Sequence, residues 1–109
     1  MALAKNNLLP LRFERVRIDK IGKPYSGRYF TVIKAADKEQ LNPRFAILVS
    51  KKISLLATDR NFLRRRVSSI IQDVLPTVYP ADYLIIPKKN SLVTNIDDLK
   101  TDLNKLFHD

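Results

Sequence analysis

The chain has 109 residues, 45% of them hydrophobic, which is enough for one folded domain with its own core and excludes a fully disordered chain. Its 20 Lys and Arg residues outnumber its 11 Asp and Glu residues, and the net charge of +9 favours an anionic partner, nucleic acid first and an anionic membrane surface second. The lack of cysteine excludes disulfides and thiolate metal sites and is typical of a protein from a reducing cytoplasm.

The N-terminal stretch MALAKNNLLPLRF contains no apolar run long enough for a signal peptide, and Pro10 interrupts the nearest one. No segment approaches the roughly 18 apolar residues that a membrane span requires. We therefore expect one domain over residues 1–109, with residues 1–8 flexible, located in the cytoplasm and not in a membrane.

Residues 9–22 allow two interpretations. Phe13, Val16 and Ile21 are compatible with a short helix, whereas RVRID at residues 15–19 alternates like a strand. We favour the helix.

Two strands are expected next. RYFTVIKA, residues 28–35, is rich in aromatic and β-branched side chains, and its alternation places Tyr29, Thr31 and Ile33 on one face. After a turn at Asn42-Pro43, residues 44–52 predict a second strand. In that strand the alternating sets are Phe45, Ile47 and Val49 against Ala46, Leu48 and Ser50.

Helical spacing of apolar residues then predicts a helix that begins at Thr58 or Asp59, either of which can cap its first turn, and ends at Leu75 before Pro76. Its buried stripe is expected to comprise Leu63, Val67, Ile70, Ile71 and Val74.

Residues 81–89 predict a buried strand that stops at Pro87, and residues 95–108 a helix whose start suits Asn95, Asp97 and Asp98. The order helix–strand–strand–helix–strand–helix describes an α+β protein, a small two-layer sandwich of helices packed on a sheet. One more strand, near residues 16–18 or 45–53, stays open.

Positive charge gathers where the middle helix begins. On a helical wheel, four residues form a contiguous polar band beside the buried stripe: Arg60, Asn61, Arg64 and Arg65. Arg66 points elsewhere, and Phe62 faces away from the core. An ordinary solvated helix face explains such a band equally simply. Arg beside Asn, the helix N-terminus and the preceding Ser-Lys-Lys favour a polyanion site instead.

Residue types for a protein-borne active site are missing. The single histidine, His108, lies near the C-terminus, and Gly22 and Gly27 form no phosphate loop. Asp97, Asp98 and Asp102 decorate a helix start and its polar face. We predict no catalytic residue and no metal site in this chain.

Three segments resemble the protein subunit of bacterial ribonuclease P. RFAILVSKK, residues 44–52, is similar to that family's strand ending in Ser/Ala-Lys-Lys, and ATDRNFLRRR, residues 57–66, to its helix with an Arg-Asn-Arg motif. DYLIIPKK, residues 82–89, is similar to its later strand that ends in basic residues. Phe62 and Ser68 depart from the family, which usually has arginine at both positions.

This resemblance implies a ribosomal-protein-like fold, with a mostly antiparallel sheet and a left-handed β-α-β crossover. It also implies two RNA surfaces. The residues expected to contact the catalytic RNA subunit are Ser50, Lys51, Lys52, Arg60, Asn61, Arg64 and Arg65. Those expected to hold the single-stranded 5′ leader of precursor tRNA are Phe13, Tyr29, Arg44 and Ala46.

The expected function is that of the ribonuclease P protein component, in a ribonucleoprotein that removes the 5′ leader from precursor tRNA. By this resemblance the RNA subunit carries the chemistry, with Mg²⁺ held by RNA and substrate, and no protein partner is obligatory. Two alternatives are a ribosomal or other structural RNA-binding protein without a role in cleavage, and a basic module for an acidic protein or an anionic membrane.

Overall fold

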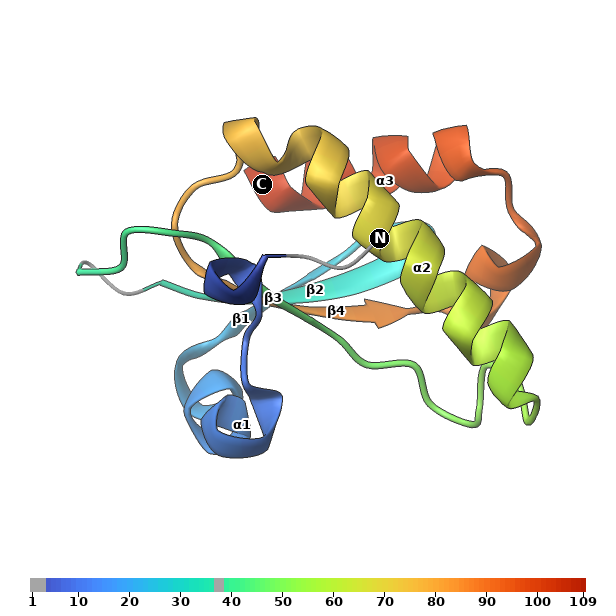
Figure 1. Cartoon of the computed structure of the whole chain (residues 1–109), viewed down its shortest axis with the longest axis horizontal. Coiled ribbons are helices and arrows are strands. Elements are labelled where there is room, and N and C mark those ends of the chain that lie inside the picture. Colours follow the sequence, from blue (N-terminus) through green and yellow to red (C-terminus); the bar gives the residue numbers. More distant parts are fainter. Residues whose placement is uncertain (1–3, 37–38) are drawn as a thin grey trace.

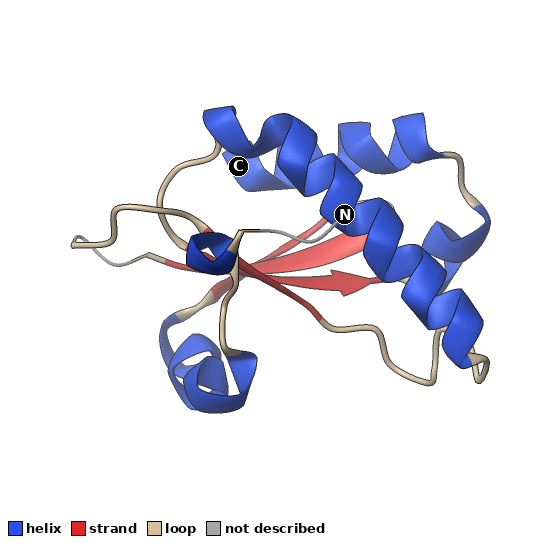
Figure 2. Cartoon of the chain, in the orientation of Figure 1, coloured by secondary structure: helices blue, strands red, loops and turns tan. Residues whose placement is uncertain are grey.

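The computed structural model describes residues 4–36 and 39–109. Over this part of the chain, helices and strands follow each other as shown in Figure 1 and, by type, in Figure 2. The order is α1 (Leu11–Ile21), β1 (Lys23–Ser26), β2 (Phe30–Ala35), β3 (Arg44–Ile47), α2 (Ala57–Val74), β4 (Asp82–Pro87) and α3 (Ile96–His108). Short 3-10 turns lie at η1 (Lys5–Asn7), η2 (Leu75–Thr77) and η3 (Lys89–Val93).

The strands form one sheet in the order β1-β2-β4-β3. β1 pairs with β2, and β2 with β4, in antiparallel fashion, whereas β3 and β4 are parallel. Parallel neighbours need a crossover, which α2 supplies between β3 and β4. The α+β class and the mostly antiparallel sheet are therefore confirmed.

The main core lies between the sheet and the pair α2 and α3, which cover the same face (Figure 1). The predicted stripe of α2 is confirmed, since Leu63, Val67, Ile70, Ile71 and Val74 are all buried. Three aromatic rings fill one end of this core: Phe45 stacks on Tyr83 at 5.3 Å between centroids, and Phe107 packs against both. The alternation predicted for residues 44–50 also holds, because Phe45 and Val49 belong to this core whereas Ala46 and Leu48 pack on the other face.

Helix α1 lies on the opposite face of the sheet (Figure 1), so the packing adds a partial layer to the predicted two. Ile18 is its buried anchor and packs in a small cluster with Leu84 and Ala35. A methyl group on Gly22 would lie 2.4 Å from the Ile18 carbonyl oxygen and 2.4 Å from Cγ2 of Ile33. Glycine therefore allows α1 to end this close to β2.

The helix favoured for residues 9–22 is confirmed as α1; Phe13, Val16 and Ile21 are exposed on it, and Ile18 is its buried residue. Two other local predictions are wrong. The additional strand is β1, which lies at neither of the positions left open. Tyr29 precedes β2 and packs on the α3 side, away from the face that Ile33 lines.

Of the two helix caps expected from the sequence, that of α3 is present and that of α2 is not. Helix α2 begins at Ala57 and no side chain caps it; the Asp59 carboxylate instead accepts a hydrogen bond from Ser54 Oγ at 2.8 Å. Asn95 does cap α3, since its side chain accepts from the Asp98 N–H at 2.9 Å. Of the segment predicted to be flexible, residues 1–3 lie outside the described residues, whereas buried Asn7 donates to the Pro43 carbonyl at 2.9 Å.

Candidate RNA-binding surfaces

The connection from β3 to α2 is folded back on the helix that follows it. Ser54 is its centre: Ser54 Oγ donates to Asp59, the Leu56 N–H donates to Ser54 Oγ at 3.1 Å, and Arg60 Nη1 donates to the Ser54 carbonyl at 2.8 Å. Buried Ile53 anchors the same connection in the main core. Sequence reasoning missed Ser54, whose only signal was a hydroxyl five residues before an acid at a helix start.

This arrangement fixes the exposed cations of the connection next to the first turns of α2. We call the six exposed or half-exposed polar residues at this end of the molecule the basic ridge. Its members are Lys51, Lys52, Arg60, Asn61, Arg64 and Arg65.

No cation of the basic ridge forms an ion pair with a carboxylate within residues 4–36 and 39–109. Arg64 Nη1 donates to Asn61 Oδ1 at 2.8 Å, which orders both side chains on the helix surface. The ridge therefore presents uncompensated positive charge beside a helix N-terminus, where backbone N–H groups add partial positive charge.

Two neighbours of the ridge have different roles. Arg66 donates to the Thr94 carbonyl at 2.9 Å, and its guanidinium lies 5.2 Å from the centroid of the Phe62 ring. Phe62 is thus a packing partner of Arg66 as well as a half-exposed ring. Ser50, predicted as an RNA contact, accepts from the Lys52 N–H at 3.3 Å and shapes the turn that carries the lysines.

A groove of about 370 Å³ runs between the start of the chain, β3 and α2. Arg64 and Ser68 of α2 line one side, and Ala46 of β3 lies on the other. Leu8 and Leu9 close it along the outer edge of β3, where the Leu9 N–H donates to the Phe45 carbonyl at 2.9 Å. One residue predicted for each RNA surface, Arg64 and Ala46, thus lines the same groove.

The other residues predicted to hold the leader are not all near this groove. Phe13 lies two residues beyond Leu11, which lines the groove, and its ring is 79% exposed with Arg12 at 5.7 Å from its centroid. Tyr29 is remote: it lines a small pocket with residues of α3, and its backbone N–H donates to Asp102 at 2.9 Å. The structure therefore places Ala46 beside Arg64 in the groove, leaves Phe13 exposed on α1 outside the groove lining, and separates Tyr29 from both.

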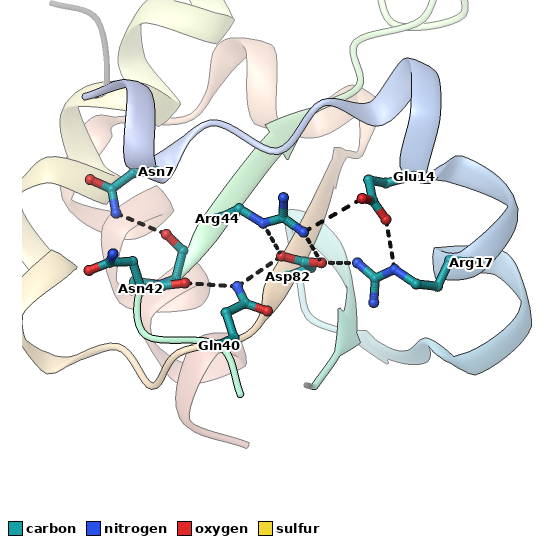
Figure 3. Close-up of polar contacts among 8 residues, drawn as sticks. Asn7, Glu14, Arg17, Gln40, Asn42, Arg44 and Asp82 are labelled. Carbon is teal, nitrogen blue, oxygen red and sulfur yellow. Dashed lines mark hydrogen bonds and ion pairs between the residues drawn. The ribbon is translucent and has the colours of Figure 1, made fainter. Parts of the chain in front are cut away.

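Arg44 is committed to a buried carboxylate (Figure 3). Its Nε and Nη2 donate to Oδ1 and Oδ2 of Asp82, each at 2.8 Å, and Asp82 is fully buried. Arg17 of α1 donates to the same carboxylate, as does Gln40 at 2.9 Å. Arg44 therefore uses Nε and Nη2 to hold Asp82, and its contact with the leader stays a prediction.

Burial alone would raise the pKa of Asp82, but hydrogen bonds from Arg44, Arg17 and Gln40 outweigh it and lower that pKa. Asp82 therefore stays ionised and holds cations from two elements at once. Glu14 adds to the network, since it accepts from Arg17 at 2.7 Å. This ionic network docks α1 onto the sheet beside the groove.

Three further observations concern His108, clusters of metal-binding side chains and membrane-spanning helices. His108 has both ring nitrogens within hydrogen-bond distance of backbone carbonyls, those of Asn104 at 2.7 Å and Thr77 at 2.9 Å. Across residues 4–36 and 39–109 no three His, Cys, Asp or Glu side chains gather so as to hold a metal ion. Among the helices of those same residues, none has the length and apolar character to cross a bilayer.

Relatives of this chain share one description. The sequence profile of the family Ribonuclease P matches residues 4–109. The ribonuclease P protein component of Rickettsia akari is 30% identical over 99 residues, which cover 82% of this chain and 84% of that protein. The corresponding protein of Microcystis aeruginosa is 32% identical over 90 residues, which cover 79% of this chain and 75% of its own length.

Solved structures agree with the sequence matches. The ribonuclease P protein from Thermotoga maritima superposes with a TM-score of 0.82 at 27% identity, over 92% of this chain and 94% of that one. The Staphylococcus aureus protein shares the fold, with a TM-score of 0.83 at 22% identity over 94% and 93%. Because the family profile and the curated relatives span most of the sequence, this chain belongs to the ribonuclease P protein family.

Proposed function

We propose that the basic ridge binds the catalytic RNA subunit of ribonuclease P. The observation that supports this most directly is the set of ridge cations without carboxylate partners among the described residues, held in place by the Ser54 contacts. A guanidinium group without a carboxylate partner can donate two hydrogen bonds to one phosphate. The N-terminus of α2 also attracts the phosphate, because its backbone N–H groups carry partial positive charge. Membership of a ribonucleoprotein family supplies the RNA partner.

The groove is proposed as the path of the 5′ leader of precursor tRNA. Ala46 is a small lining residue, Arg64 supplies a cation, and Phe13 is an exposed aromatic residue of α1, the helix whose first residue, Leu11, lines the groove. Single-stranded RNA is bound in this manner, by a cationic channel with aromatic rings on which bases stack. Tyr29 and Arg44 do not line this groove.

In this proposal the assembled enzyme is an endoribonuclease whose chemistry resides in the RNA subunit. Mg²⁺ is held by that RNA and by the substrate, as the resemblance implies, and this chain supplies binding and charge compensation. The proposed setting is the cytoplasm, with precursor tRNA and the RNA subunit as partners and no obligatory protein partner. Reduced phosphate repulsion is the physical benefit: cations of the ridge replace metal ions that the RNA otherwise needs to bring its own strands and the substrate together.

Reconstitution tests this proposal. The chain is added to a bacterial ribonuclease P RNA at low Mg²⁺, and cleavage of precursor tRNA is followed. We expect cleavage to rise at low Mg²⁺ and the rise to shrink at high Mg²⁺, where metal ions already screen the phosphates. Binding without any increase in cleavage would contradict the proposal and favour a structural RNA-binding protein. Equal affinity for anionic vesicles and RNA would favour a membrane-binding module.

A further inference from the structure

A second cavity, of about 650 Å³, lies far from the basic ridge. It is bounded by β1, β2, the segment before β4 and the end of α3, so it lies near the C-terminal end of α2 (Figure 1). Since α2 has 18 residues, its two ends are about 27 Å apart. We call this cavity the tyrosine pocket; the lining residues that matter below are Lys23, Tyr25, Lys34, Tyr79, Tyr83 and Phe107.

Aromatic rings form much of the pocket. Tyr83 and Phe107 are buried at its floor, Tyr25 is half-buried, and Tyr79 is 77% exposed. The Tyr79 carbonyl accepts a hydrogen bond from the Tyr83 hydroxyl at 2.7 Å, so the backbone of Tyr79 is fixed while its ring faces solvent. An exposed ring on a fixed backbone is a ready surface for stacking a planar group.

Two lysines face each other in the same pocket. Lys23 of β1 and Lys34 of β2 are directly opposite in the antiparallel register, an arrangement of like charges that destabilises a sheet and that a bound anion would relieve; Asp109 also lines the pocket. Lys34 Nζ donates to the backbone oxygens of Phe107 at 3.0 Å and Asp109 at 2.7 Å, and lies 4.7 Å from the Tyr25 ring centroid. Burial lowers the pKa of Lys34, with Asp109 partly opposing that shift.

We infer that the tyrosine pocket binds one unpaired nucleotide of an RNA strand. Its base stacks on Tyr79 beside Tyr25, and its phosphate sits between Lys23 and Lys34. The volume suits a ligand of this size, and stacking surface next to paired cations matches the two halves of a nucleotide. The net charge of +9 favours RNA over a neutral ligand. The choice of RNA rests on the proposed function.

Titration with adenosine 5′-monophosphate, followed by NMR, tests the pocket directly. We expect shifts of the amides of residues 23–26, 34–36 and 79–81 and of the Tyr25 and Tyr79 rings. Tyr79→Ala should remove these shifts and Tyr79→Phe should keep them. Lys105→Gln is the control, because it removes one positive charge from an exposed position outside the pocket. Shifts confined to residues 51–65, or unchanged in Tyr79→Ala, would overturn the inference.

Binding to RNA separates this inference from the proposed function. Tyr79→Ala should lower the affinity of the chain for the complex of RNA subunit and precursor tRNA by about fivefold or more, whereas Tyr79→Phe should not. If Arg60→Ala weakens RNA binding and Tyr79→Ala does not, the pocket inference is wrong and the proposed function stands. If the pocket binds the nucleotide but the chain fails to raise cleavage, the proposed function is wrong and the pocket stands.

Discussion

The arginines of α2 differ in the contacts that they make within the chain. Arg65 is exposed and has no partner among the described residues, whereas Arg60 also donates to the Ser54 carbonyl at 2.8 Å and Arg66 is engaged with Thr94 and Phe62. Their substitutions should therefore separate RNA contact from local structure.

Arg65→Ala should weaken binding to the RNA subunit by about 1–3 kcal/mol, because a charged hydrogen-bond donor to phosphate is lost. Its free energy of unfolding should change by less than about 0.5 kcal/mol, as for other exposed positions. Arg60→Ala should lose similar affinity and also about 1 kcal/mol of stability. Filter binding and thermal unfolding measure both quantities, with Arg66→Ala as the matched control; an Arg65→Ala chain that binds like the parent contradicts the RNA contact.

Residue types alone could not separate free cations from paired ones. The sequence places Arg44 and Arg65 in one basic stretch, and only the fold shows that Arg44 lies against Asp82, which is 38 positions away. Tyr29 illustrates the same limit, since a residue just before a strand does not obey the alternation of that strand. The α2 ridge could be predicted because helical periodicity fixes the relative directions of its own side chains.

At the scale of elements, the attachment of α1 depends on few contacts. Ile18 buries one apolar side chain, and Arg17 joins the Asp82 network of Figure 3. Asp82→Asn should reduce stability by about 3–5 kcal/mol, because Arg17 and Arg44 would then face a neutral group in a buried site. Chemical denaturation measures this loss, and hydrogen exchange should show α1 losing protection first.

Asp73→Asn is the control for that substitution. Asp73 forms an exposed pair with Lys100 at 3.4 Å, so its loss should cost less than about 1 kcal/mol. Equal effects of the two substitutions would show that the Asp82 network does not dock α1.

Stability should also depend on pH through Asp82. Its pKa is lower in the folded chain than the value of about 3.9 expected when unfolded, so the ionised carboxylate stabilises the fold. This contribution is complete above the unfolded pKa and disappears as pH falls through the folded pKa. Unfolding measured between about pH 7 and pH 2 should show a steeper acid loss in the parent chain than in Asp82→Asn. Parallel curves would contradict this assignment.

Long periodic elements were predictable and short edge elements were not. Helix α2 has five buried residues at helical spacing, which defines its face without tertiary information. Strand β1 has only four residues, includes Pro24 and is exposed for most of its length, so it lacks the alternation that marks a strand. The buried face of α1 could not be predicted either, because the contact of Arg17 with Asp82 joins residues 65 positions apart and is visible only in the fold.

Over the whole molecule, the basic ridge and the ionic network lie in different surroundings. Cations near α1 and β3 are neutralised by Asp82 and Glu14, whereas those at the start of α2 are not neutralised within the described residues. Five cations without a carboxylate partner among the described residues therefore lie together at one end, beside a groove that leads toward α1. This separation lets one set of arginines hold the fold and leaves another for a polyanion.

The salt dependence of binding to the RNA subunit tests this account most directly. If the five ridge cations each neutralise one phosphate, log affinity should fall against log salt with a slope of about −3.5 to −4.5. The double variant Arg60→Ala, Arg65→Ala should bind more weakly with a slope of about −2 to −3. A parent slope near zero, or an identical slope in the double variant, would contradict the claim that these guanidinium groups contact RNA phosphates.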